Sequence, residues 1–392
     1  MEMTKAQPTW PYYAPDEILA VTNVLHSGKV NYWTGNEARL FEQEYASYVG
    51  TQYAIAMMNG TVALEAILYA LDIGPGDEVI VTSRTFIASA SAIVMRGAIP
   101  VMADVDADSQ NITADTIKVA ISSKTKAIIA VHLAGWPCDM DPIIELAKQH
   151  NLKLIEDCAQ AHGAIYKGKQ VGSLGHAAAF SFCQDKIITT GGEGGMVTTN
   201  DRQLWQKMWE FKDHGKSYAA VYQREHPPGF RWLHESFGTN WRITEMQAAI
   251  GRIQLQKLST WLETRRRNAA ILTRALTKFP SIRLPLPNDD VLHAYYKYYL
   301  FVKPEYLRSE WSRDKIMQAI NDSGVACFSG SCSEIYLEQA FIKTNLQPQK
   351  RLPVAKELGE TSLMLLVHPT LGEEDMLNSA KIVEKVFQSA SI

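Results

Sequence analysis

Short apolar runs alternate with amphipathic segments over the first 160 residues of the chain. The runs predict strands at 53–58, 78–82, 99–105, 125–135 and 152–160, and the segments between most of them predict helices. Because strands that alternate with helices form βαβ units, this order predicts a largely parallel sheet covered on both faces. Such a sheet places ligands in the loops that follow the carboxyl ends of its strands.

The pattern changes beyond residue 160. Two further strands, 178–182 and 194–200, flank a glycine-rich turn. The remaining pattern predicts a strand at 297–303 and helices at 15–26, 36–49, 201–213, 243–257, 258–279, 312–323 and 374–388. A boundary near 250–260 divides the chain into a large domain, 1–255, and a smaller one, 256–392.

Composition and charge narrow the classes of function. The 392 residues carry 39 basic and 42 acidic side chains, a net charge of −3, so no basic excess argues for nucleic acid. No apolar run is long enough to cross a bilayer, and residues 1–17 lack the apolar core of a signal peptide. Five widely spaced cysteines form no CxxC pair, which favours free thiols in a reducing compartment. We expect a cytoplasmic protein without a membrane or nucleic-acid partner.

The densest cluster of candidate chemistry surrounds Lys186. This lysine stands between a predicted strand end and the glycines of the segment 191–195. A lone lysine before a flexible turn is usually a surface residue. The functional alternative is a lysine that forms a Schiff base with a carbonyl, which must lose its proton to react.

A second candidate is Asp157, at the end of the predicted strand 152–160. Alone it is a helix cap or a loop carboxylate. Beside a Schiff-base lysine, a carboxylate at this position suits pyridoxal phosphate (PLP), because it keeps a proton on the ring nitrogen. Gln160, three residues later, could hydrogen-bond the ring oxygen.

A third candidate is the helix start at Asn59, Gly60 and Thr61. Free N–H groups at a helix N-terminus suit a phosphate, although ordinary capping by Asn59 explains the same residues. Ser181 could add a hydroxyl to the same phosphate. Phe86 could lie flat on a cofactor ring, or it could belong to the core.

Together these motifs resemble the DegT/StrS group of PLP-dependent sugar aminotransferases over nearly the whole chain. The motifs are MNGTVAL (58–64), TFIAS (85–89), HLAGWPCDMDPI (132–143), IEDCAQAHGA (155–164), SFCQDKIITTGGEGG (181–195), HG (214–215) and GTNWRITEMQAAIGRIQL (238–255). Cys183 departs from the histidine, asparagine or aromatic residue of many relatives, and we assign it no catalytic role. The segments 329–336 and 366–371 follow the group only loosely.

The resemblance implies the α/β fold of type I PLP-dependent transferases. This fold has a large domain with a mostly parallel, seven-stranded sheet, a smaller C-terminal α/β domain and a homodimer with a shared active site. The resemblance also implies the site residues: Lys186 as Schiff-base lysine and proton carrier, Asp157 at the pyridine nitrogen, Gln160 near the ring hydroxyl, Phe86 against the ring, Gly60, Thr61 and Ser181 at the phosphate, and Asn240 reaching the phosphate from the partner subunit.

The implied reaction moves an amino group from L-glutamate to a keto- or aldehydo-sugar, with pyridoxamine phosphate between the two halves. A narrower resemblance, in 329–341 and 214–242, is to aminotransferases that make 8-amino-3,8-dideoxy-manno-octulosonate (8-amino-Kdo) for lipopolysaccharide. The acceptor would then be the 8-aldehyde of Kdo; the alternative is a nucleotide-linked keto-sugar. Arg231, Arg242 or Lys216 could pair with the acceptor's carboxylate, or each could be a solvated surface charge.

Three other functions compete with this interpretation. A PLP sugar dehydratase of the same fold replaces the lysine with histidine, and Lys186 argues against it. A nicotinamide dehydrogenase would carry G-x-G-x-x-G after an early strand, which the sequence lacks. A non-catalytic regulator of this fold should lack the lysine or the aspartate, and both are present. We expect no metal, because the histidines His214, His226 and His234 are spaced too widely for a ligand motif.

Overall fold

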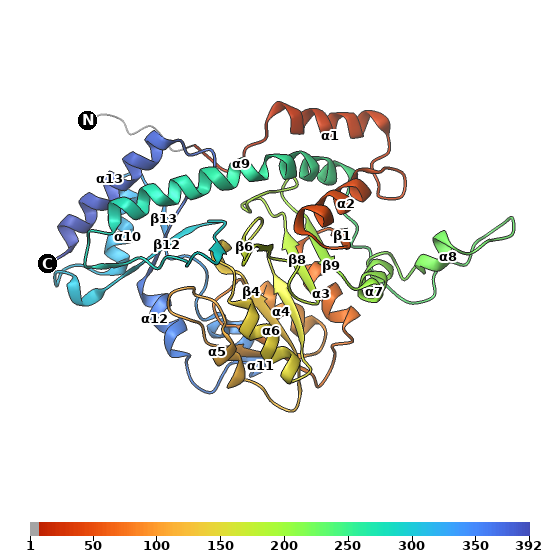
Figure 1. Cartoon of the computed structure of the whole chain (residues 1–392), viewed down its shortest axis with the longest axis horizontal. Coiled ribbons are helices and arrows are strands. Elements are labelled where there is room, and N and C mark those ends of the chain that lie inside the picture. Colours follow the sequence, from red (N-terminus) through yellow and green to blue (C-terminus); the bar gives the residue numbers. More distant parts are fainter. Residues whose placement is uncertain (1–7) are drawn as a thin grey trace.

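A computed structural model describes residues 8–392 (Figure 1). The first seven residues of the segment 1–17, on which the signal-peptide prediction rests, lie outside the described residues. Within the described part of the chain, no helix is both long and apolar enough to cross a membrane.

The centre of the molecule is a seven-stranded sheet, as the resemblance implied. Its order is β1-β9-β8-β5-β4-β2-β3, and only the pairings of β9 are antiparallel. The strands are β1 Tyr53–Met57, β2 Glu78–Thr82, β3 Ile99–Ala103, β4 Thr125–Val131, β5 Lys153–Asp157, β8 Ala177–Ser181 and β9 Gly195–Thr199. Each of them lies on a predicted run, because a sheet buried on both faces needs nearly continuous apolar strands.

Helices cover both faces of this sheet. Alternate residues of one strand enter different cores: Val79 and Val81 lie in one, and Ile80 lies in the other. The first core receives α3 (Gly60–Ala70), α4 (Ala88–Met95) and α7 (Arg202–Lys212); the opposite face receives α5 (Ala114–Lys118), α6 (Met140–Gln149) and α2 (Glu37–Val49).

One long helix, α9 (Glu245–Leu276), replaces the two helices predicted at 243–257 and 258–279. It starts at Thr244, whose hydroxyl accepts a hydrogen bond from the Gln247 N–H, and it crosses the molecule beside α1 (Pro15–Ser27) and α13 (Glu373–Ala390) (Figure 1). Its residues up to Leu262 pack in the core of the large sheet, and those from Ala269 onward pack in a separate C-terminal core. The division into 1–255 and 256–392 stays a prediction.

The C-terminal core surrounds a four-stranded antiparallel sheet of order β10-β12-β14-β13. Its strands are β10 Ile282–Arg283, β12 Tyr298–Val302, β13 Cys327–Phe328 and β14 Ser362–Leu365, and α10 (Arg313–Asp322) and α13 pack with it. The smaller remaining elements are β6 Ile165–Tyr166, β7 Lys169–Gln170, β11 Val291–Leu292, α8 Tyr218–Tyr222, α11 Gln339–Thr344 and α12 Pro353–Thr361.

The segment between β13 and β14 returns to the large sheet. The Thr85 N–H donates to the Cys332 carbonyl at 3.2 Å, and the Ile335 N–H donates to the Ser83 carbonyl at 3.1 Å. Both carboxylate oxygens of Asp104, just after β3, accept N–H groups from the start of α12. The C-terminal part of the chain therefore forms one wall of the space above the sheet.

Candidate active site

A large cavity lies at the carboxyl ends of the parallel strands, where the fold class predicts a ligand. Its volume is about 920 Å³, and the segment 328–338 and the start of β12 close its far side. Seven of the predicted site residues line it: Gly60, Thr61, Phe86, Asp157, Gln160, Ser181 and Lys186.

Lys186 lies in the loop after β8 and is fixed by its backbone. Its N–H donates to the Cys183 carbonyl at 3.0 Å, and its own carbonyl accepts the Trp10 indole N–H at 2.9 Å. Its ammonium lies 3.5 Å from the Tyr296 hydroxyl and 3.7 Å from Asp185 Oδ1, and the side chain is only 16% exposed. The lysine therefore enters the cavity rather than standing on the surface.

Asp157 lies at the buried end of the cavity, at the last position of β5. Ser89 Oγ donates to its Oδ2 at 2.7 Å, and the Ala159 N–H donates to its Oδ1 at 3.1 Å. Burial raises the pKa of Asp157 despite these bonds. A cation at this position would favour the ionised carboxylate, which is what a protonated ring nitrogen supplies.

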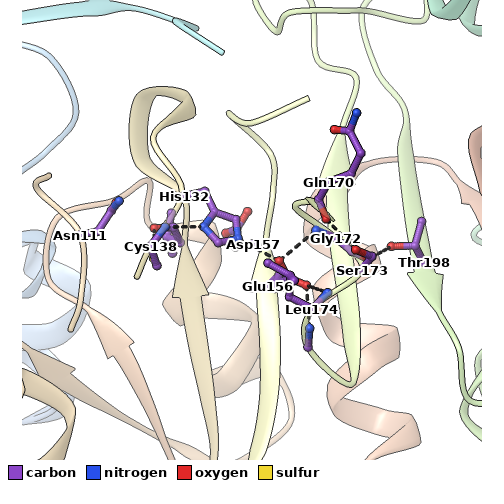
Figure 2. A network of polar contacts seen from close by, with 12 residues as sticks. Asn111, His132, Cys138, Glu156, Asp157, Gln170, Gly172, Ser173, Leu174 and Thr198 are labelled. Atoms are coloured by element: carbon purple, nitrogen blue, oxygen red, sulfur yellow. Dashed lines mark hydrogen bonds and ion pairs between the residues drawn. The ribbon is translucent and has the colours of Figure 1, made fainter. Parts of the chain in front are cut away.

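A buried hydrogen-bond network behind Asp157 fixes the strand that carries it (Figure 2). The Cys138 N–H donates to His132 Nδ1 at 2.9 Å, so Nε2 carries the proton and donates to Glu156 at 3.0 Å. Glu156 also accepts N–H groups from the turn 172–175 at 2.7–2.9 Å. Burial alone would raise the pKa of Glu156, but these hydrogen bonds lower it.

The same network includes three side chains of types that bind metal ions. Ligand atoms of His132, Glu156 and Cys158 lie within 4.8 Å of one another. Both ring nitrogens of His132 and both carboxylate oxygens of Glu156 already take part in hydrogen bonds. We therefore assign the cluster a structural role in holding β4, β5 and the turn 172–175 together.

A second part of the cavity suits a phosphate. Asn59 caps α3 by accepting the Val62 N–H at 3.0 Å, which leaves the Gly60 and Thr61 N–H groups ahead of the first intrahelical bond. A Cβ at Gly60 would lie 2.8 Å from the Ser181 Cβ, so only glycine allows this close approach. Ser181 Oγ accepts the N–H of Cys183 at 3.3 Å, and its hydroxyl proton is free to turn toward a ligand.

Gln160 and Phe86 also line the cavity. The Gln160 Oε1 accepts the Ala134 N–H at 2.8 Å, so its NH₂ group remains available as a donor. The ring of Phe86 is 67% exposed, which excludes the alternative that it is a core residue. Both placements fit a flat aromatic cofactor with a ring hydroxyl.

Four other predicted residues do not line the cavity of their own chain. Lys216 and Arg242 both pair with Asp213 Oδ1, at 3.0 and 2.7 Å. Asn240 pairs with the backbone of Asp213, and Arg231 is exposed. Their predicted roles in binding the acceptor, or the partner's phosphate, stay predictions.

Several cavity residues were not predicted from the sequence. Tyr296 donates its hydroxyl proton to Asp185, and Lys297 and Tyr299 follow it along the wall formed by the start of β12. Burial alone would raise the pKa of Asp185, but the Lys186 charge and the Tyr296 hydroxyl lower it. Asp185 adjoins Lys186 in sequence and could have been found there, whereas nothing in the sequence connects Tyr296 to it.

The cavity therefore fits the predicted cofactor. A glycine-lined helix start and a hydroxyl suit its phosphate, a buried carboxylate suits its ring nitrogen, and a lysine suits its carbonyl carbon. The cavity also holds a free amide donor and an exposed aromatic ring. The fold brings this set together from four separate segments of the chain: 60–61, 86, 157–160 and 181–186.

Comparisons with known proteins agree with this geometry. The sequence model of the DegT/DnrJ/EryC1/StrS aminotransferase family matches residues 11–386. The chain is 37% identical over 369 residues to the dTDP-3-amino-3,6-dideoxy-alpha-D-galactopyranose transaminase of Aneurinibacillus thermoaerophilus, covering 94% of this chain and 93% of that protein. It is 35% identical over 353 residues to the GDP-perosamine synthase of Escherichia coli O157:H7, covering 90% and 91%. A solved aminotransferase from Psychrobacter cryohalolentis is 58% identical, with a TM-score of 0.96 over 97% of this chain and 99% of that one.

Proposed function

The chain belongs to the DegT/DnrJ/EryC1/StrS aminotransferase family, and we propose that it moves an amino group from L-glutamate to a sugar carbonyl through Lys186. Family membership makes it a PLP-dependent sugar aminotransferase. The amino donor, the acceptor and the role of each residue are the proposed part. The observation that carries them is the presence of Lys186 and Asp157 in one cavity, 29 residues apart in sequence.

We assign each part of the cofactor to the cavity residues that suit it. Gly60, Thr61 and Ser181 hold the phosphate, Gln160 donates to the ring hydroxyl, and Asp157 holds the proton of the ring nitrogen. When bound, pyridoxal phosphate supplies an electron sink for the charge that develops on the substrate carbon. The Ser89 hydroxyl and the Ala159 N–H fix the orientation of the Asp157 carboxylate, because each donates to one of its two oxygens.

Lys186 moves the proton in both halves of the reaction. Its amine takes a proton from the donor's α-carbon and returns one to the acceptor's carbon during the reverse path. Asp185 and Tyr296 position the Nζ atom, because one lies 3.7 Å and the other 3.5 Å from it. Proton transfer requires the Lys186 Nζ atom to lie close to the substrate carbon, and its fixed position provides this.

For the acceptor we propose the 8-aldehyde of Kdo, which gives 8-amino-Kdo for lipopolysaccharide. It rests on the resemblance of 329–341 and 214–242 described above, and the first of these segments forms a wall of the cavity. A nucleotide-linked keto-sugar is equally supported, because two relatives are named for dTDP- and GDP-linked sugars. The regulator alternative is weaker, because both the lysine and the aspartate lie in the cavity.

We also propose a homodimer in which each cavity borrows residues from the partner. The segment 223–240 forms a loop whose outer part extends away from the body of the chain beyond α8, while residues 233–239 pair back with residues 211–217 (Figure 1). It exposes Phe230, Trp232 and Phe237 at 78%, 81% and 98%. Exposed aromatic clusters of this kind mark interfaces. Asn240 and Arg231 belong to this segment, which explains how they can serve a cavity other than their own.

Two measurements test the proposal. The first is the absorbance of the purified protein with PLP, before and after adding L-glutamate. Bleaching of the cofactor band that a keto acid reverses supports the donor, and a band indifferent to glutamate rejects it. The second compares kcat/KM for the Kdo 8-aldehyde with kcat/KM for dTDP- and GDP-linked keto-sugars. A preference for a nucleotide-linked sugar would reject the Kdo acceptor and leave the aminotransferase assignment intact.

A further inference from the structure

Lys297 gives the active cavity a second amine that the assigned roles leave unused. It directly precedes β12 and lines the cavity. Its ammonium lies 4.7 Å from the ring centroid of Tyr296, and the ammonium of Lys186 lies 5.0 Å from the same centroid. The two amines therefore stand beside one aromatic ring, close to the atoms that react.

The ammonium of Lys297 lacks a hydrogen-bonding partner of opposite charge. Over residues 8–392 the structure records no hydrogen bond or ion pair from its side chain; the recorded contact is the ring of Tyr296. Asp185 is the carboxylate that attracts it, and Asp185 already accepts the Tyr296 hydroxyl and lies near Lys186. A half-buried cation in this state can still bind an anion from solution.

The surroundings of Lys297 carry an excess of positive charge. Arg265 is fully buried beside the same tyrosine, donating to the Tyr296 carbonyl at 3.2 Å. Burial lowers the pKa of His368 to about 3, so this neighbour stays neutral. Three cations, Lys186, Lys297 and the buried Arg265, thus interact electrostatically with one carboxylate, Asp185. The cavity's other acidic residues are Asp157, engaged by Ser89, and the exposed Glu193 and Glu338.

The phosphate of the cofactor does not account for this charge. The phosphate site is built from the start of α3 and from Ser181. Lys297 instead borders a small hollow that Ala134 also lines, and the Ala134 N–H donates to Gln160. Every amino-acid donor carries a carboxylate on the carbon whose proton Lys186 removes. A cation beside Lys186 is placed to bind that carboxylate.

We infer that Lys297 is a substrate-binding residue that pairs with a carboxylate of a substrate in the cavity. This inference rests on the proposed transamination and adds the residue that binds the substrate's carboxylate. The carboxylate comes either from the amino donor or from a sugar-acid acceptor such as the Kdo aldehyde. An ammonium is suited to one such group, because it is a compact point charge with three donors.

The direct test measures binding without turnover. Glutarate, a dicarboxylate with neither amino nor keto group, is titrated into the PLP-loaded protein by calorimetry. We expect Lys297→Met to weaken glutarate binding by about ten- to a hundredfold, the usual loss of a charge-assisted hydrogen bond. Lys297→Arg should recover most of the affinity. The matched control is Lys303→Met, which removes a lysine whose ammonium lies 5.6 Å from the Tyr306 ring, outside the cavity.

Half-reactions then separate the two sources of the carboxylate. If the donor supplies it, Lys297→Met raises the glutamate concentration needed to bleach the cofactor band and leaves the acceptor half unchanged. If the acceptor supplies it, the effect falls on the return of the band with the sugar. A wild-type protein that fails to bind glutarate, or a Lys297→Met protein that binds it within about twofold of wild type, overturns the inference. Binding of glutarate that depends on Lys297, without any bleaching by glutamate, would instead reject the proposed donor alone.

Discussion

Replacing Asp157 with asparagine isolates the charge of the buried carboxylate from its shape. The amide of the Asp157→Asn variant is isosteric with the carboxylate, and its oxygen can keep the hydrogen bond from the Ala159 N–H. Its NH₂ group then faces Ser89 Oγ, which can turn and donate to Thr85 Oγ1, 3.0 Å away. Every local hydrogen bond can therefore be kept, and what is lost is the negative charge.

The expected magnitude follows from this geometry. Loss of one preorganised electrostatic group in a closed active site costs about 10²–10³-fold in kcat, about 2.7–4 kcal/mol. Stability should move in the other direction. Because burial raises the pKa of Asp157, the folded cofactor-free chain is less stable with the carboxylate ionised than with it protonated. The asparagine removes this cost, so the cofactor-free variant should unfold at the same temperature as wild type or higher.

The assay compares single-turnover bleaching by glutamate with thermal unfolding of the cofactor-free chain. Ser89→Ala is the matched control: it keeps the charge and removes one neutral partner, a loss of about 1 kcal/mol and hence a severalfold slower turnover. An Asp157→Asn protein that bleaches within tenfold of wild type would refute the assignment of Asp157 to the ring nitrogen. A rate lost together with a lowered unfolding temperature would show a structural role instead.

Three further predictions follow from the same cavity. Lys186→Ala should nearly abolish turnover, because a positioned base contributes about 10²–10⁴-fold, and added methylamine should restore part of the rate; unchanged turnover would reject Lys186 as the base. Gly60→Ala should weaken PLP binding in a titration, because its Cβ would lie 2.8 Å from the Ser181 Cβ and such overpacking costs about 1–3 kcal/mol; equal PLP affinity would place the phosphate elsewhere. Burial lowers the pKa of Lys297 to about 8, so its charge is present below that pH and lost above it, and glutarate affinity should fall about tenfold between about pH 7 and pH 9. Asp185, Lys186 and Arg265 face the same site, and Lys297→Arg should flatten this pH profile if Lys297 is the titrating group.

The sequence was most informative where one segment carries both a pattern and its chemistry. Strands buried on both faces need continuous apolar runs, so all seven strands of the large sheet lay on predicted runs. Asp157 ends one such strand and Lys186 follows another, and the carboxyl ends of parallel strands meet at one edge. The family resemblance implied that the two residues share a site, and the parallel pairing of β5 with β8 brings them into one cavity.

The sequence was least informative where a site depends on distant or very short segments. Tyr296 reaches Asp185 across 111 residues, and no local pattern encodes that contact. The two-residue strand β13 has no measurable periodicity, and it was missed. Arg242 and Lys216 were candidates to pair with the acceptor's carboxylate, and no pattern indicated that both pair with Asp213 in their own chain; their role toward the acceptor stays a prediction. The break predicted between the helices 243–257 and 258–279 is absent, because α9 continues without interruption from Glu245 to Leu276.

Two groups that line the cavity carry opposite unbalanced charges. Asp157 is a buried carboxylate whose hydrogen-bond partners are neutral, and burial raises its pKa. Lys297 is a half-buried amine whose recorded contact is an aromatic ring, and burial lowers its pKa. A protonated ring nitrogen would supply the cation that Asp157 lacks, and a substrate carboxylate would supply the anion that Lys297 lacks. Lys186 and Lys297 lie beside the same Tyr296 ring. A cofactor paired with Asp157 and a substrate carboxylate paired with Lys297 would therefore both lie near the Lys186 amine, which must move the proton.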